Sequence, residues 1–356
     1  MEKCPICKTN DADKKNVHLI PWFLIKNYIT EGGTGERDRE LSFSISLDGF
    51  TKIYAGRSIL PEKIEEFGEL NDLQKEKENP YSRNNIICSE CESKFSRIEA
   101  IFASRFSNKR LTSEYDSKNT ITINGNSIFI DNNYASSLFE LSIQSIFYRC
   151  SIGRFKGFKL PSDVEKKIEE NIRLAFSSLG FKTIRSTEQI SVPNKFPIIS
   201  SAFFAPEGED NSNNFIVLHH SRIPYYLLTG KWVFQLYEAE KCIKSSKEWI
   251  YGLRDKLKPL DLYPYIKERS HVVMLAPQTS KMISQNIINL FVHKKVIGIK
   301  KNIRAFYFYL YKDKPSRTSF EYICSRYFFH HGKGKTEVDS MMHAFNDFKP
   351  SILPLN

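Results

Sequence analysis

The chain has 356 residues, 41% of them hydrophobic and 13% aromatic, which is enough to build two folded domains and excludes an intrinsically disordered protein. It contains no run of about 18 apolar residues, which excludes a transmembrane helix, and its first five residues lack the apolar region of a signal peptide. We therefore expect a cytoplasmic protein. The formal net charge of +11 is uneven, because residues 1–115 carry 18 Lys and Arg against 19 Asp and Glu, whereas the remainder carries a formal +12. This predicts a polyanion bound mainly by the C-terminal two thirds, with a Lys-rich composition bias as the alternative.

Two C-x-x-C pairs are the strongest pattern in the sequence. Cys4 and Cys7 form the first pair, and Cys88 and Cys91 form the second. Each pair presents two thiolates from one tight turn, and two pairs supply the four soft ligands of a tetrahedral zinc site. In a reducing compartment a metal site is a better explanation of these cysteines than disulfides. We expect this zinc to be structural.

The N-terminal third predicts a small domain with an insertion. The elements expected in chain order are a strand over 17–20, a helix over 22–29, a strand over 41–47 with a partner near 53–54, and a charged helix over 62–77. Residues 41–80 exceed what a minimal zinc module needs and are interpreted as the insertion. After Cys91 a helix is expected, with Phe95, Ile98 and Phe102 on one face and Glu92 and Glu99 on another. The polar stretch 107–118 predicts a domain boundary near residue 115.

Residues 116–356 predict a basic α+β domain. A hairpin is expected over 120–130 around Asn124-Gly125, followed by helices over 134–150 and 162–179. Four strands are expected over 196–205, 215–219, 232–237 and 271–276, then a helix over 282–292 and a strand over 303–311. The sheet should be mostly antiparallel or mixed, so the fold class expected for the whole chain is α+β.

The N-terminal third resembles the HNH, or ββα-metal, endonucleases that carry a four-cysteine zinc clip. The resemblance rests on His18-Leu19-Ile20-Pro21 between the two cysteine pairs, on Asn84 or Asn85 before the second pair, and on the pairs themselves. It is closer to uncharacterised bacterial HNH-like proteins with the pattern H-[IL]-I-P followed by C-x-x-C-E-x-x-[FL]-S-x-x-E. The resemblance implies a ββα or treble-clef-like domain that cleaves phosphodiester bonds, as in bacterial defence or mobile-element nucleases.

The same resemblance implies a set of roles for individual residues. His18 would be the general base, and a Mg²⁺ or Mn²⁺ ion beside it would stabilise the leaving oxygen. Glu92 would ligate that cation, Asn84 or Asn85 would orient His18, and Glu99 is a further candidate acidic ligand. The family usually has a metal ligand where this chain has Val17, and Asn or His where it has Glu92. The alternatives are a non-catalytic zinc-stabilised nucleic-acid-binding protein and a protein–protein adaptor.

A basic cluster near the C-terminus is the candidate nucleic-acid-binding site. It precedes the strand expected over 303–311, whose tyrosines would share one face, and consists of Lys294, Lys295, Lys300, Lys301 and Arg304. Cations beside aromatic rings suit phosphates and bases respectively, and DNA is favoured over RNA as the polymer. The alternative interpretation is a solvated helix end leading into an amphipathic strand.

Overall fold

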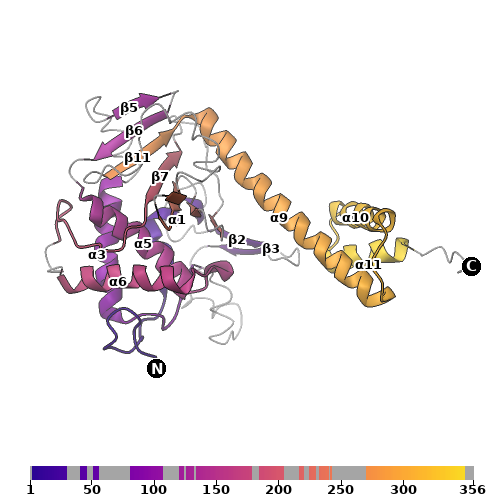
Figure 1. Ribbon diagram of the computed structural model, residues 1–356, viewed down its shortest axis with the longest axis horizontal. Coiled ribbons are helices and arrows are strands. Elements are labelled where there is room, and N and C mark those ends of the chain that lie inside the picture. Colours follow the sequence, from indigo (N-terminus) through magenta and orange to yellow (C-terminus); the bar gives the residue numbers. More distant parts are fainter. Residues whose placement is uncertain are drawn as a thin grey trace, which may run out of the picture. The chain divides into compact units, whose positions relative to one another are not determined.

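The computed structural model describes the greater part of the chain (Figure 1), namely residues 2–29, 41–45, 51–55, 81–106, 120–123, 126–131, 134–178, 184–203, 216–219, 224–229, 232–239, 241–242 and 270–348. The contacts divide the chain into two compact units. Unit 1 comprises Met1–Leu41 and Ala55–Ile283, and unit 2 comprises Ser42–Tyr54 and Ser284–Asn356. The division does not fall near residue 115, because the helix after Cys91 shares one hydrophobic core with the helices and strands that follow.

In unit 1 a two-stranded ribbon precedes the helix that carries the second cysteine pair. β1 (Val17–His18) pairs antiparallel with β4 (Ser82–Arg83), and α3 (Ser89–Phe106) begins six residues later. Asp13 caps α3, since its carboxylate accepts the Ser89 amide at 2.9 Å. The expected apolar face of this helix is confirmed, because Phe95, Ile98 and Phe102 are all buried. The short helix expected after Pro21 is also present as α1 (Trp22–Ile29).

Two further helices of unit 1 pack against α3. α5 (Ser136–Ile152) is buried along nearly its whole length, so it is a central helix with no solvated face. A single 3₁₀ turn, η6 (Phe155–Gly157), leads to α6 (Ser162–Ser178), whose apolar stripe includes Val164, Ile168 and Ile172. Both helices agree with the sequence prediction. Edge-to-face packing of Phe95 on Phe176, at 4.9 Å between ring centroids, joins α3 to α6.

A seven-stranded mixed sheet forms the other layer of unit 1 (Figure 1). Its strand order is β5-β6-β11-β7-β10-β9-β8, and only the pairing of β11 with β7 is parallel. The strands are β5 (Thr120–Ile123), β6 (Asn126–Asp131), β7 (Ile198–Phe203), β8 (Ile216–His219), β9 (Tyr225–Thr229), β10 (Trp232–Leu236) and β11 (Ser270–Leu275). The hairpin predicted around Asn124-Gly125 and the four later strands are confirmed, whereas β9 was not predicted. The expected α+β class with a mixed sheet is therefore correct.

The end of α5 lies so close to β1 that one position requires glycine. A Cβ added to Gly153 would lie 2.4 Å from Leu19 Cδ2 and 3.0 Å from the Arg149 carbonyl oxygen. We expect Gly153→Ala to destabilise unit 1 by about 1–3 kcal/mol, the usual cost of overpacking a core. Urea unfolding followed by tryptophan fluorescence measures this. The matched control is Gly298→Ala, because a Cβ at this position meets no atom within 4 Å. This substitution should raise helix stability. Equal effects of the two substitutions would contradict the close approach at Gly153.

Within its described residues, unit 2 contains two whole helices and most of a longer one, and these three have a hydrophobic core of their own. α9 (Pro277–Tyr311) is one continuous helix, followed by α10 (Arg317–Gly332) and α11 (Glu337–Asp347). The core residues include Ile299, Ile303, Ile323, Tyr327 and Phe345. Ser316 and Thr336 cap α10 and α11 by accepting an amide hydrogen three residues on, each at 3.1 Å. Unit 2 also holds the hairpin of β2 (Leu41–Ile45) and β3 (Thr51–Ala55), as the sequence predicted.

The strand expected over 303–311 is a helix, and this prediction was wrong. Residues 306–311 are all apolar or aromatic, so alternation between the two faces of a strand could not be distinguished from a helix by local pattern. The helix is stabilised by burial of Ile299 and Ile303 and by the partly buried Phe306, which follow helical spacing, and Phe306 packs edge-to-face on Phe345 at 4.9 Å. The charged helix expected over 62–77 lies outside the described residues. None of the helices in the described ranges has the length and apolar character needed to cross a bilayer.

Candidate metal centre and active site

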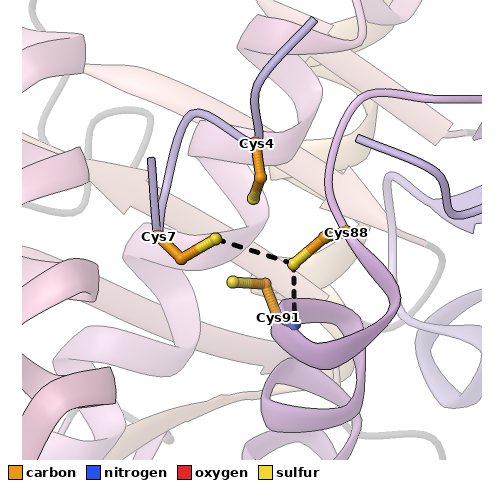
Figure 2. A group of neighbouring side chains, drawn as sticks. All are labelled: Cys4, Cys7, Cys88 and Cys91. Carbon is orange, nitrogen blue, oxygen red and sulfur yellow. Dashed lines mark hydrogen bonds between the residues drawn. The ribbon is translucent and has the colours of Figure 1, made fainter. Parts of the chain in front are cut away.

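Four cysteine side chains converge at the start of α3 (Figure 2). Cys4, Cys7, Cys88 and Cys91 place their Sγ atoms within 4.8 Å of one another, and Cys7 and Cys88 are 3.8 Å apart. A tetrahedral zinc site with Zn–S bonds of about 2.3 Å has sulfur–sulfur edges of about 3.8 Å. The geometry and the all-thiolate donor set therefore fit a structural zinc ion, as the sequence predicted.

The local backbone explains why the four sulfurs meet. The Cys4 amide donates to the Asn10 carbonyl at 2.8 Å, which closes the first cysteine loop, and Lys8 has a positive φ of 63° in that turn. Cys88 accepts hydrogen bonds from the Cys91 amide at 3.4 Å and from the Asn10 side chain at 3.8 Å. Such N–H donors stabilise thiolate ligands and orient them.

The charge of the cluster favours a bound cation. A hydrogen bond from the Cys91 thiol lowers the pKa of Cys4 to about 4. The same contact raises the pKa of Cys91, with burial adding to the effect, and burial raises the pKa of Cys88. Burial alone would raise the pKa of Cys7, but hydrogen bonds from Thr9 and Asn10 outweigh this effect, so its pKa is lowered as well. The cluster alone therefore favours thiolates at two of the four cysteines. A divalent cation would offset the repulsion among the remaining thiolates.

A buried arginine connects β1 to α3. Arg149 of α5 is fully buried and donates through one terminal nitrogen to the His18 carbonyl at 2.7 Å. Its other terminal nitrogen forms an ion pair with Glu99 of α3, and its guanidinium lies 4.9 Å from the Phe95 ring centroid. The strand that ends at His18 and the helix that carries the two acidic residues are thus held together by one side chain. Sequence analysis did not identify Arg149, although a lone arginine in an otherwise buried helix is a signal that could have found it.

The two glutamates on α3 share this neighbourhood. Burial raises the pKa of Glu99, the Arg149 charge opposes that rise, and the negative charge of Glu92 adds to it. Burial also raises the pKa of Glu92, while the charges of Arg149 and Lys14 lower it. Glu92 Oε2 is buried and has no hydrogen-bond partner among the described residues. A buried carboxylate oxygen without a partner is costly and is a candidate ligand for a cation.

His18 is half-buried at the end of β1, opposite Ser82 of β4. Its ring lies 6.5 Å from the Trp22 ring, centroid to centroid. Val17 is completely buried and belongs to the hydrophobic core, which accounts for an apolar residue where the resemblance implies a metal ligand. The main chain after His18 is also held, because the Cys150 thiol donates to the Leu19 carbonyl at 3.5 Å.

Asn84 and Asn85 lie in the turn between β4 and α3. The Asn84 side-chain oxygen accepts the Asn16 amide hydrogen at 2.9 Å, and the Asn85 amide donates to the Lys14 carbonyl at 2.8 Å. Asn16 and Asn85 both have positive φ, of 55° and 58°. These bonds link this turn to residues 14–16, which lead into the strand that ends at His18.

The candidate nucleic-acid-binding lysines lie on α9 rather than before a strand. Lys300, Lys301 and Arg304 are exposed, and the Arg304 guanidinium lies 4.4 Å from the Phe320 ring centroid. Lys294 and Lys295 are also on this helix, outside the side chains that the structure describes. The expected tyrosine face does not exist as such, because Tyr307 and Tyr311 pack together at 4.6 Å and both contact Phe348.

Comparisons of the chain with protein-family models, with curated proteins and with solved structures found no match. The function therefore has to be inferred from the chemistry of the residues themselves. Those residues are the four-cysteine cluster, His18, the two glutamates on α3, and Arg149, which contacts the His18 carbonyl and Glu99.

Proposed function

We propose that unit 1 is a metal-dependent nuclease of the HNH type, in which His18 activates water and the cysteine cluster holds a structural zinc. The observation that supports this best is the Arg149 bridge. It brings the strand ending at His18 and the acidic face of α3 into one neighbourhood, although Arg149 is 131 residues from His18 and 50 from Glu99. Proximity of a base to carboxylates that hold a cation is what phosphodiester hydrolysis requires.

The order of elements supports the same proposal. β1 and β4 form an antiparallel ribbon, and α3 follows directly, with one cysteine pair before the ribbon and the other at the start of the helix. This is the order of a ββα-metal module whose two strands are separated by an insertion. A zinc ion held by both pairs would fix the start of α3, and therefore the position of Glu92 next to Cys91.

In this proposal each side chain has a distinct role. A neutral His18 accepts a proton from the attacking water near pH 7. Glu92 would hold a Mg²⁺ or Mn²⁺ ion through its unpartnered carboxylate oxygen, and such an ion would supply stabilisation of the leaving oxygen. Glu99 is paired with Arg149, so it positions the arginine and leaves Glu92 as the principal acidic ligand. Asn84 and Asn85 hold the turn that enters β1.

His18→Ala is expected to reduce cleavage by roughly a hundredfold or more, the usual effect of removing a general base. Glu92→Gln should also abolish most activity, while zinc content and melting temperature stay unchanged. The assay uses single- and double-stranded DNA and RNA with Mg²⁺ or Mn²⁺. The matched control is His343→Ala, an exposed histidine on α11 that should leave the rate unaltered. Cleavage that survives His18→Ala would overturn the assignment.

The second candidate function is a zinc-stabilised nucleic-acid-binding protein without catalysis. Two observations favour it, namely the buried Val17 in place of a metal ligand and the engagement of Glu99 by Arg149. Both reduce the number of groups left to hold a catalytic cation. If the protein binds DNA or RNA but cleaves neither polymer with Mg²⁺ or with Mn²⁺, the result would identify this function instead of the nuclease.

A further inference from the structure

Unit 2 exposes an unusual number of large apolar side chains. Every exposed large hydrophobic residue among the described parts of the chain lies between residues 297 and 342, and the set is Ile297, Phe308, Tyr309, Leu310, Tyr322, Phe329, Val338 and Met342. Single exposed apolar residues are normal, but such a concentration marks an interaction surface. Unit 1 shows none within its described residues, so the feature belongs to the three-helix unit.

The same unit is strongly basic. Residues 284–356 carry 12 Lys and Arg against 5 Asp and Glu, a formal +7 of the chain's +11. The partner of this surface should therefore be negatively charged and should also have flat apolar groups that can pack on the exposed aromatic rings. These two requirements together are met by the phosphates and bases of a nucleic acid.

On α10 the rings and cations alternate along a single stripe. Tyr322, Arg326 and Phe329 follow at i, i+4 and i+7, which places them on one side of α10, and Lys333 is the residue that caps the end of this helix. Both cations lie over the same ring, with the Arg326 guanidinium 4.7 Å and the Lys333 ammonium 4.3 Å from the Phe329 centroid. The Phe329 side chain nevertheless remains 46% exposed.

The stripe on α10 is held in place by α11. Asp347 accepts a hydrogen bond from Arg326 Nε at 2.6 Å and lies 2.8 Å from the His330 ring nitrogen. The Tyr322 hydroxyl donates to the Asp347 carbonyl at 3.4 Å. Ordering of these side chains before binding lowers the entropic cost of forming a complex.

A second set of the same kind lies on α9. Lys301 and Phe308 lie on α9 at i and i+7, and Lys312, the residue that follows the helix, places its ammonium 5.0 Å from the centroid of the Tyr309 ring. Tyr309 is 68% exposed and Phe308 55%. Exposed rings flanked by cations therefore occur on two helices of unit 2.

We infer that unit 2 binds single-stranded nucleic acid, with unpaired bases stacked on Phe329 and its neighbouring exposed rings and phosphates held by Lys333. Stacking on an aromatic side chain requires an unpaired base, because bases in a duplex already stack on each other. The inference deepens the proposed function by naming the form of its substrate, and it rests on that proposal for its biological meaning. Its test measures binding alone.

The test uses the full-length, zinc-bound protein carrying His18→Ala, without added divalent cation, so that cleavage does not interfere. Fluorescence anisotropy compares labelled 20-nucleotide oligo(dT) and oligo(U) with a duplex of the same length. We expect tighter binding of both single strands than of the duplex. Phe329→Leu, which removes the ring and keeps an apolar side chain, should weaken single-strand binding by at least about fivefold. Lys333→Gln should reduce the slope of log affinity against log salt by about 0.7.

Val338→Ala is the matched control, because Val338 is 68% exposed on α11 but has no ring. It should leave the affinity unchanged. Equal affinity of Phe329→Leu and the parent, or preference for the duplex, would overturn the inference. So would Phe329-dependent binding of polyglutamate or anionic lipid vesicles in place of oligonucleotides. If Phe329→Leu binds as tightly as the parent but cleavage still depends on His18, only the binding inference fails. If binding depends on Phe329 but no cleavage occurs, only the nuclease proposal fails.

Discussion

Cys88→Ser is expected to unfold unit 1 and to remove the bound zinc. Cys4, Cys88 and Cys91 are at most 2% exposed and belong to the same hydrophobic core as α5 and the sheet. Structural zinc sites contribute about 10–16 kcal/mol of apparent binding free energy, which exceeds the net stability of most domains. Loss of one ligand should therefore affect the whole unit rather than a surface loop.

The measurement combines elemental analysis with tryptophan fluorescence. Purified protein should hold about one zinc per chain. Trp22 and Trp232 lie within unit 1, so their emission reports on this unit. The control is Cys242→Ser, a cysteine outside the cluster that should keep both zinc and fold. Cleanly folded protein without any zinc would refute the metal site.

Arg149→Met is expected to destabilise unit 1 by about 3–5 kcal/mol. The substitution leaves the Glu99 carboxylate buried without its counter-charge, and breaking one side of a buried ion pair has this cost. It also removes the hydrogen bond to the His18 carbonyl. Urea unfolding followed by tryptophan fluorescence measures the loss.

The double variant Arg149→Met, Glu99→Gln is the informative control. It removes both charges, so much of the stability should return, and the double-mutant cycle then gives a coupling energy between the two residues. If the loss of unfolding free energy in the double variant equals the sum of the losses in the two single variants, the ion pair does not exist in solution. If unit 1 is the proposed nuclease, the restored protein should still cleave slowly, because the hydrogen bond from Arg149 to the His18 carbonyl is lost, which separates positioning from stability.

Much of unit 1 follows from local pattern. The spacing of the two cysteine pairs predicts the ligand set, since a C-x-x-C turn brings two thiolates together wherever it occurs. The helical period of Phe95, Ile98 and Phe102 predicts which face of α3 is buried, and Asn124-Gly125 predicts the β5–β6 hairpin. In each case the determining interactions lie within a few residues of one another, which is why the sequence alone is sufficient.

The remaining features depend on contacts between distant segments. Arg149 becomes part of the candidate site only because α5 contacts both β1 and α3, and no local signal indicates which buried charge will meet Glu99. Residues 303–311 suit a strand as well as a helix, and packing of Phe306 on Phe345 favours the helix. The division into units likewise depends on which elements share a core. The sequence by itself determined the ligands and the local elements, whereas long-range burial decided their partners, because burial energy depends on surfaces that meet only after the chain has folded.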